Sequence, residues 1–324
     1  MALVLNGLKL NPPVFLAPMA GITDSPSREI AKMFCPGLVV SEMIASSEKD
    51  KVYFESKIKE NLSANKTNVE TCPTAIQIAG HEIEWMTYAA KVIEHEGGEL
   101  IDLNLGCPAK KIVGKFAGSA LMREPTHTQN LIDSVVRATK LPVTVKMRLG
   151  WDEENMNAPM IAKSAEDSGV QMITVHARTR NQFFFGKADW SCVKDVKDVV
   201  SIPVIVNGDI IDQESAIEAI NKSFADGIMV GRGAIGNPWL ISELSAAVFG
   251  SNESKPADQL EMNQLISLHL DKTLKFYGKD VGLKIFRKHL EKYLKPFKLS
   301  NTFRRELLSE NSIDEFAKKL ELIF

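Results

Sequence analysis

The chain of 324 residues predicts an α/β fold, a (β/α)8 TIM barrel followed by a C-terminal helical-bundle domain. Between residues 14 and 250, eight short β-branched runs alternate with helical patterns, as in an eight-unit barrel. A doubly wound open sheet also alternates strands and helices, but no G-x-G-x-x-G follows the first run, which disfavours that fold. Strand patterns stop near residue 251, and helical periodicity continues to the end. We therefore expect a barrel domain over residues 1–250 and a helical domain over residues 251–324.

Each expected strand is a short apolar or β-branched run that ends at a loop. The strands are Val14–Ala17, Leu38–Ser41, Thr74–Ala79, Leu100–Leu103, Val143–Met147, Met172–Val175, Pro203–Val206 and Gly227–Val230. The helices expected between them begin near Ser25, cover His81–Glu96, Pro125–Thr139, Ala158–Ser168 and Gln213–Lys222, and resume after Pro238. The lysine-rich segment Asp50–Asn68 lacks apolar periodicity, so we expect it to be helical in part at most. The polar segment Asn252–Asp258 is the expected linker between the domains.

The composition is that of an ordinary globular protein, with 25% charged residues, 44% hydrophobic residues and a net charge of −2. No apolar run approaches the roughly 18–20 residues of a membrane span, and the N-terminus lacks a signal-peptide pattern. The widely spaced Cys35, Cys72, Cys107 and Cys192 indicate neither a disulfide framework nor a zinc site, and we expect no metal. We therefore expect a reducing, cytoplasmic setting without a membrane partner.

A cysteine follows the fourth expected strand, in the run Leu103-Asn104-Leu105-Gly106-Cys107-Pro108. Pro108 disfavours a helical backbone at Cys107, so we expect the thiol on a loop at the strand end. A free cysteine is commonly an inert, small apolar residue. The residues at the other strand ends favour a chemical role instead.

The carboxyl ends of the strands form the active site of a barrel of this type. The first strand ends at Pro18, Met19 and Ala20, and the others end in hydrogen-bonding or titratable groups: Glu42; Gln77; Asn104 and Cys107; Lys146 and Arg148; His176 and Arg178; Asn207, Gly208 and Asp209; Gly231 and Arg232. A lone Lys146 or His176 is commonly structural, whereas polar groups at all the ends together indicate a ligand site.

The last two strand ends indicate that the ligand is anionic. Asn207-Gly208-Asp209 and Gly231-Arg232-Gly233 offer backbone N–H groups and an arginine, the usual phosphate site of such barrels. Lys146 would stabilise an anionic ring over the barrel mouth, and Gln77 would bind a heterocycle edge. Together these features predict bound FMN.

A basic segment near the C-terminus predicts a nucleic-acid partner. Residues 272–305 contain eleven basic residues against Asp280 and Glu291, a surplus of nine positive charges. An apolar stripe at helical spacing is formed by Leu283, Phe286, Leu290, Tyr293 and Leu294, and the opposite face carries Lys284, Lys288, Lys292 and Lys295. Solvent-exposed helix faces usually carry charges of both signs. A face with positive charges alone therefore favours a surface that binds the phosphate backbone of a nucleic acid. Phe183–Phe185 would either stack on unpaired bases or pack on the barrel.

The motifs APMAGITD (17–24), SEM (41–43), QIAG (77–80), LNLGCPAKK (103–111), GSALM (118–122), VKMRLGW (145–151), HARTR (176–180), NGDI (207–210) and MVGRGAIGNPW (229–239) occur in this order. By these motifs the chain resembles the tRNA-dihydrouridine synthases along nearly its whole length, and most closely the bacterial B type. One departure is Ala177, where the family often has glycine.

The resemblance implies an FMN-dependent, NADPH-driven reduction of a uridine in the D loop of tRNA, with position 17 suggested by the B type. Reduced flavin would give hydride to C6 and Cys107 a proton to C5, while Asn104 would contact the target base. Arg148 and Arg178 would face the substrate. FMN would be held by Pro18, Met19, Ala20, Gln77, Lys146, His176, Asn207, Gly208, Asp209, Gly231 and Arg232. The helical domain would bind tRNA through Lys284, Lys288 and Lys292.

The predicted acid must be neutral when it acts, and an ordinary thiol, with a pKa of about 8.5, is protonated at pH 7. Because lysines beside a thiol lower its pKa, we expect Lys110 and Lys111 to face tRNA phosphates. Two other functions stay open: an FMN oxidoreductase acting on a free pyrimidine, resembling dihydroorotate dehydrogenase, and a tRNA-binding protein or chaperone with a structural flavin. No obligate protein partner is evident, and we expect a monomer.

Overall fold

The structure is a computed structural model that describes residues 2–63, 72–251 and 259–323. Within these ranges, eight parallel strands close into a barrel: β3 (Val14–Leu16), β4 (Leu38–Val40), β6 (Thr74–Ala79), β7 (Leu100–Leu105), β8 (Val143–Arg148), β9 (Met172–His176), β10 (Val204–Asn207) and β11 (Gly227–Val230). The ring closes because β3 pairs with both β11 and β4, and β4 pairs with β6. The predicted TIM barrel is confirmed.

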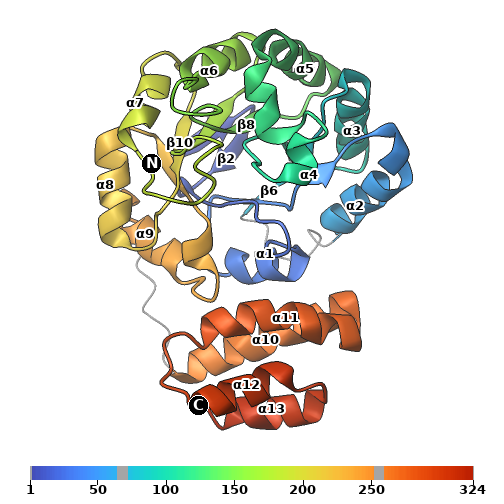
Figure 1. Cartoon of the computed structure of the whole chain (residues 1–324), viewed down its shortest axis with the longest axis vertical. Coiled ribbons are helices and arrows are strands. Elements are labelled where there is room, and N and C mark those ends of the chain that lie inside the picture. Colours follow the sequence, from blue (N-terminus) through green and yellow to red (C-terminus); the bar gives the residue numbers. More distant parts are fainter. Residues whose placement is uncertain (1, 64–71, 252–258, 324) are drawn as a thin grey trace.

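Helices surround the strands, and Figure 1 shows them as a ring around the barrel. They are α1 (Ser25–Lys32), α2 (Lys51–Ser63), α3 (Ile83–His95), α5 (Pro125–Ala138), α6 (Ala158–Asp167), α7 (Ser191–Lys197), α8 (Gln213–Ser223) and α9 (Leu240–Phe249). The short helix α4 (Lys110–Val113) follows β7, and 3-10 turns cover Glu48–Asp50, Gly118–Arg123 and Arg232–Ala234. Because both faces of each strand are covered, the strands are nearly continuous apolar runs.

Helix α2 departs from the sequence prediction. Phe54, Ile58 and Leu62 are buried at a spacing of four residues and pack in the barrel core. The segment therefore has an apolar face, and the prediction that it lacks one was wrong, because the lysines and glutamates between these positions obscure it. Residues 64–68 of the predicted segment lie outside the described residues.

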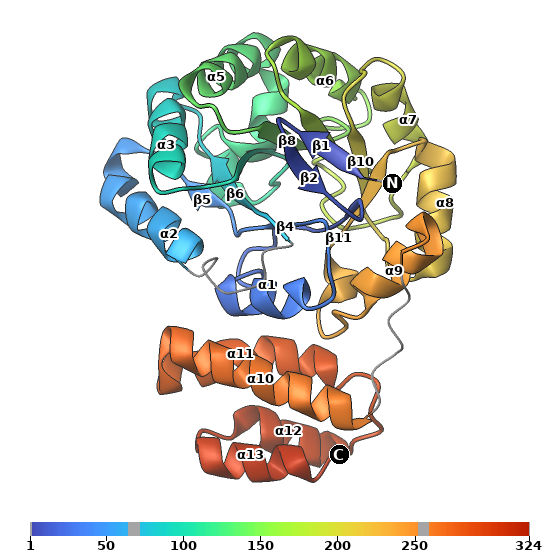
Figure 2. The same cartoon turned by 180° about the vertical axis from the view of Figure 1, so that it is seen from behind.

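A hairpin that the sequence analysis did not predict covers the amino end of the barrel (Figure 2). Its strands β1 (Leu3–Leu5) and β2 (Leu8–Leu10) are antiparallel, and the turn residues Asn6 and Gly7 both have positive φ. An Asn-Gly pair is the usual signal for such a turn. The buried leucines of the hairpin pack under the first residues of the barrel strands, so the site must lie at the opposite end. The short strand β5 (Ile44–Ala45) pairs with β6 beyond β4.

The C-terminal part is a helical domain of α10 (Gln259–Tyr277), α11 (Lys279–Tyr293), α12 (Asn301–Ser309) and α13 (Ile313–Glu321). Figure 1 shows α10 and α11 between the barrel and the other two helices. The apolar stripe predicted for residues 283–294 is buried and packs with Ile30 of α1 and Trp239. The predicted linker, residues 252–258, lies outside the described residues. Among the described helices, none is long and apolar enough to cross a membrane.

Candidate active site

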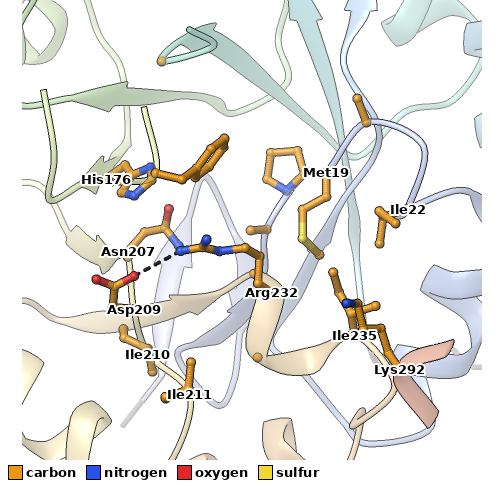
Figure 3. Close-up of a pocket in the computed structure, with 18 of the residues that line it drawn as sticks. Met19, Ile22, His176, Asn207, Asp209, Ile210, Ile211, Arg232, Ile235 and Lys292 are labelled. Atoms are coloured by element: carbon orange, nitrogen blue, oxygen red, sulfur yellow. Dashed lines mark hydrogen bonds and ion pairs between the residues drawn. The ribbon is translucent and has the colours of Figure 1, made fainter. Parts of the chain in front are cut away.

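A cavity of about 1210 Å³ opens at the carboxyl ends of the barrel strands. All the residues predicted to hold FMN line it, and so do Asn104, Cys107 and Arg148. In Figure 3, Met19, His176, Asn207 and Arg232 face one space, and Lys292 of α11 stands at its edge. The strands bring these residues together because parallel strands end at one edge of the sheet.

The loop after β7 holds Cys107 by its backbone and leaves its side chain in the cavity wall. The N–H of Cys107 donates to Asn104 Oδ1 at 2.9 Å. Its carbonyl oxygen accepts from the N–H of Ser119 at 3.1 Å and from Ser119 Oγ at 2.9 Å. Gly118 has a φ of +64°, and a β-carbon there would lie 2.8 Å from the Cys107 carbonyl oxygen. Only glycine therefore allows the chain to pass this close to Cys107.

A chain of buried polar groups runs beneath this loop. Asp102 Oδ2 accepts from Gln77 Nε2, and Gln77 Oε1 accepts from Asn104 Nδ2, each at 2.7 Å. Asn104 Oδ1 accepts from the N–H groups of Gly106 and Cys107, so its side chain shapes the cysteine loop. Asp102 was not among the predicted site residues, although an aspartate within an apolar strand is a visible signal in the sequence. Burial raises the pKa of Asp102, while hydrogen bonds from Thr144 and Gln77 lower it.

Lys146 rises from β8 under the cavity. Its Nζ donates to Asn207 Oδ1 at 3.2 Å, and Asn207 Nδ2 donates to the Met229 carbonyl at 2.7 Å, so the residue that holds the ammonium group is itself fixed to the neighbouring strand β11. Burial first, and then the positive charge of Arg148, lowers the pKa of Lys146 to about 8. The amine therefore changes charge near neutral pH.

Arg148 ties two loops together. Its Nε donates to the Gly106 carbonyl and its Nη1 to the Thr179 carbonyl, both at 2.8 Å. Burial first, and then the charge of Arg178, lowers the pKa of Arg148 to about 10. Burial and the charge of Lys146 likewise hold the pKa of His176 well below its usual range, so its imidazole is neutral at pH 7.

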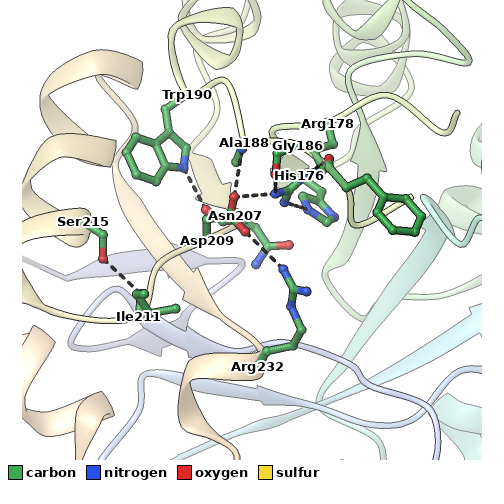
Figure 4. A network of polar contacts seen from close by, with 12 residues as sticks. His176, Arg178, Gly186, Ala188, Trp190, Asn207, Asp209, Ile211, Ser215 and Arg232 are labelled. Atoms are coloured by element: carbon green, nitrogen blue, oxygen red, sulfur yellow. Dashed lines mark hydrogen bonds and ion pairs between the residues drawn. The ribbon is translucent and has the colours of Figure 1, made fainter. Parts of the chain in front are cut away.

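Arg178 lies behind the cavity wall rather than in it. Its side chain is 1% exposed, donates to the carbonyls of Phe185 and Gly186 at 3.1 and 2.7 Å, and pairs with Asp209 (Figure 4). Asp209 also accepts from the N–H of Ala188 at 2.9 Å and from Arg232 Nη2 at 3.1 Å. Arg178 therefore fixes the loop after β9, whereas the family resemblance placed it toward the substrate.

That loop presents its aromatic residues in different directions. Phe183 and Phe184 line the cavity. Phe184 is 53% exposed, and the guanidinium groups of Arg148 and Arg232 lie 5.6 and 5.1 Å from its ring centre. Phe185 is 79% exposed. The loop thus offers both a cavity wall and an exposed ring, and stacking on unpaired bases stays a prediction.

The lysines of α11 that are predicted to bind tRNA form no ion pair with the described residues. Lys284, Lys288 and Lys292 are exposed, and no carboxylate of the described residues pairs with them. On the outer helices, by contrast, Lys163 and Lys222 each pair with an acidic residue of the same helix, and Lys194 pairs with Asp198, the residue that caps the end of α7. Lys110 and Lys111 are exposed on α4 and do not line the cavity.

Comparison with known proteins assigns this chain to a family. The family described as "Dihydrouridine synthase (Dus)" matches residues 15–323. A Rhodobacter capsulatus protein named "Probable tRNA-dihydrouridine synthase" is 49% identical over 295 residues, 90% of this chain and 89% of that protein. The "tRNA-dihydrouridine synthase B" of Pasteurella multocida is 40% identical, over 90% of this chain and 86% of that protein. The chain belongs to the dihydrouridine synthase family of enzymes.

Two solved structures share the fold of this family member. A 2-naphthoyl-CoA reductase complex superposes with a TM-score of 0.60 at 12% identity, over 77% of this chain and 52% of that protein. Histamine dehydrogenase from Rhizobium sp. 4-9 gives a TM-score of 0.57 at 14% identity, over 84% of this chain and 50% of that protein. This chain therefore spans about half the length of each structure, and the likeness concerns the barrel fold.

Ala177, which departs from the family pattern, fits its position without disturbing the loop. It is buried, its N–H donates to the Asn207 carbonyl at 2.9 Å, and its carbonyl accepts from the N–H of Asp189 at 2.8 Å. The backbone path after β9 thus accommodates a β-carbon here.

Proposed function

We propose that this protein reduces a uridine in the D loop of tRNA to 5,6-dihydrouridine, with FMN as its cofactor and NADPH as the reductant. The observation that carries the proposal is the position of Cys107. The backbone N–H and carbonyl groups of Cys107 are both hydrogen-bonded, and its thiol lines the same cavity as Lys146, Asn207 and Arg232. An acid and an anion-binding site thus share one space large enough for a cofactor and a base.

The chain offers FMN a phosphate site and a ring site. A β-carbon on Gly231 would meet nothing closer than 3.7 Å, so its backbone is open to a phosphate, and Arg232, the next residue, lines the same cavity. Gly208, with a φ of +116°, lets the chain turn close to His176, where a β-carbon would lie 2.8 Å from the ring. The Lys146 ammonium group supplies positive charge below the ring site. The residues present therefore suit FMN.

The protein's part in the reaction is to orient the uracil and to supply a proton. Bound FMN supplies the two-electron reduction of the C5–C6 bond, and NADPH restores the reduced cofactor. Cys107 Sγ gives its proton to C5, and the resulting thiolate regains a proton from solvent. Asn104 and Arg148 keep the cysteine loop in place through Cys107 N–H and the Gly106 carbonyl.

The unpaired lysines of α11 support tRNA as the substrate. Lys292 lines the cavity, and a β-carbon on Gly21 would lie 3.5 Å from Lys288 Nζ, so the basic face adjoins the barrel mouth. A polyanion on this face would reach the cavity with one of its bases. In this proposal Lys110 and Lys111 contact phosphates on the other side of the mouth, and the protein acts as a monomer in the cytoplasm.

The proposal is tested by mapping dihydrouridine in tRNA from cells with and without the protein. We expect one D-loop position, 17 by the B-type resemblance, to lose dihydrouridine and to regain it when the protein is restored. The purified protein should bind FMN, and NADPH should bleach the flavin absorbance. Reduction of a free pyrimidine with unchanged tRNA would favour the small-molecule oxidoreductase. A flavin that NADPH does not bleach would favour the binding protein.

A further inference from the structure

A second group of buried polar side chains lies outside the cavity, where the helical domain meets the barrel. His269 of α10 and His289 of α11 are 2% and 3% exposed, and their ring centres are 4.6 Å apart. The Nε2 atom of each ring lies 3.3 Å from Ser27 Oγ of α1. One hydroxyl group therefore joins three helices from both domains, and the reaction proposed above does not use it.

The hydrogen-bonding capacity of Ser27 determines which nitrogen carries the proton in the imidazole rings of His269 and His289. Its only hydroxyl proton is donated to Asp24 Oδ1 at 2.6 Å, so Ser27 Oγ can only accept from the two imidazoles. Each histidine therefore carries its proton on Nε2. His269 Nδ1 then accepts from the Tyr293 hydroxyl, 3.1 Å away. Burial lowers the pKa of both histidines, in keeping with neutral rings.

This group connects the two halves of the proposed site. Asp24 caps α1 by accepting from the N–H of Ser27 at 3.0 Å, and it ends the loop that carries Pro18, Met19 and Ala20. His289 lies next to Lys288 on α11, the helix whose lysines adjoin the barrel mouth. Further along α11, a β-carbon on Gly236 would lie 2.4 Å from the Lys292 carbonyl carbon, so this backbone packs directly on the loop after β11.

We propose that Ser27, His269 and His289 are positioning residues that set α11 over the barrel mouth, so that tRNA bound to the helix presents its uridine to Cys107. The proposal rests on the proposed function. Without the shared acceptor, two buried N–H groups lose their partner, and α11 loses the polar contact that sets its position along α1. The lysines of α11 then no longer match the spacing between the tRNA backbone and the cavity.

The test compares Ser27→Ala with Ser27→Thr, which keeps the hydroxyl group, and with Ser223→Ala. Ser223 is a matched control because it is buried and hydrogen-bonded within α8, away from the helical domain. For Ser27→Ala we expect the KM for tRNA to rise about tenfold, the size of one lost hydrogen-bond acceptor, with kcat within about twofold. Ser27→Thr and Ser223→Ala should keep the wild-type KM, and all three should keep wild-type flavin reduction by NADPH.

Two measurements without tRNA separate this proposal from the proposed function. Imidazole ¹H–¹⁵N spectra should show both rings protonated on Nε2, and amide hydrogen exchange in α10 and α11 should increase in Ser27→Ala alone. Unchanged exchange, an unchanged KM for tRNA, or an equal effect of Ser223→Ala would overturn the positioning role. If the wild-type protein makes no dihydrouridine, the proposed function fails, and the exchange and the spectra still decide whether Ser27 joins the two domains.

Discussion

Cys107 carries the proposed proton transfer, and its effect can be separated from cofactor binding. Replacing it with alanine removes the acid but leaves the backbone bonds to Asn104 and Ser119. We expect dihydrouridine formation to fall by about 10²–10⁴-fold, the usual contribution of a positioned acid, with FMN binding and flavin reduction retained. Cys192→Ala is the control, because this free cysteine lies outside the cavity lining. Undiminished product from the Cys107 variant would contradict the role.

Lys146 should make flavin reduction depend on pH. Because its pKa is lowered to about 8, its positive charge is present below that pH and is lost as the pH rises through it, well before an ordinary lysine titrates. We expect the rate of flavin reduction by NADPH to fall above pH 8 in the wild type. The rate in Lys146→Met should be lower and should not change around pH 8. Stopped-flow absorbance between pH 6 and pH 10 measures both, and an alkaline fall retained in the variant would show that another group titrates.

Helix α11 should bind tRNA mainly through charge. Replacing Lys284, Lys288 and Lys292 by Gln removes three unpaired cations, so tRNA should bind more weakly at low salt. The slope of log K against log salt should become shallower by about 2–3, since each phosphate contact contributes about 0.7–0.9. Flavin reduction by NADPH should not change.

The matched control for this helix is Lys163, Lys194 and Lys222 replaced by Gln on the outer helices. Each of these lysines pairs with an acidic residue three or four positions along the chain, so the same loss of charge occurs away from the site. Affinity measured by filter binding across a salt series should fall only for the α11 variant. Equal losses in the two variants would indicate a general effect of net charge.

A substitution at the amino end of the barrel should lower stability without affecting FMN binding at the carboxyl end. Leu5 of the hairpin is fully buried beneath the amino end, opposite the cavity. Leu5→Ala should lower the free energy of unfolding by about 2–5 kcal/mol, as for other buried leucines, because it leaves a cavity in the core. FMN affinity at 25 °C should stay at the wild-type value. Thermal unfolding and flavin titration measure the two effects, and a parallel loss of affinity would contradict the separation.

Much of the molecule could be predicted from local patterns in the chain. The eight strands, the apolar stripe of α11 and the polar strand ends each depend on residues close together in sequence. The apolar face of α2 was not predicted, because charged residues separate Phe54, Ile58 and Leu62, and neither was the hairpin, although Asn6-Gly7 is a local turn signal. The role of Asp102 was not predicted either, since its partners Gln77 and Thr144 lie on neighbouring strands.

The sequence by itself therefore determined the barrel, the helical domain and the strand ends that form the mouth, because periodicity and turn residues act between neighbours in the chain. Only the tertiary structure decided that Arg178 holds a loop behind the cavity wall, and that Asn104 uses its side chain to shape the cysteine loop. It alone also brought His269 and His289 to Ser27, more than two hundred residues away. The physical reason is that a polar side chain has few hydrogen bonds to make, and its partners are known only when distant elements meet.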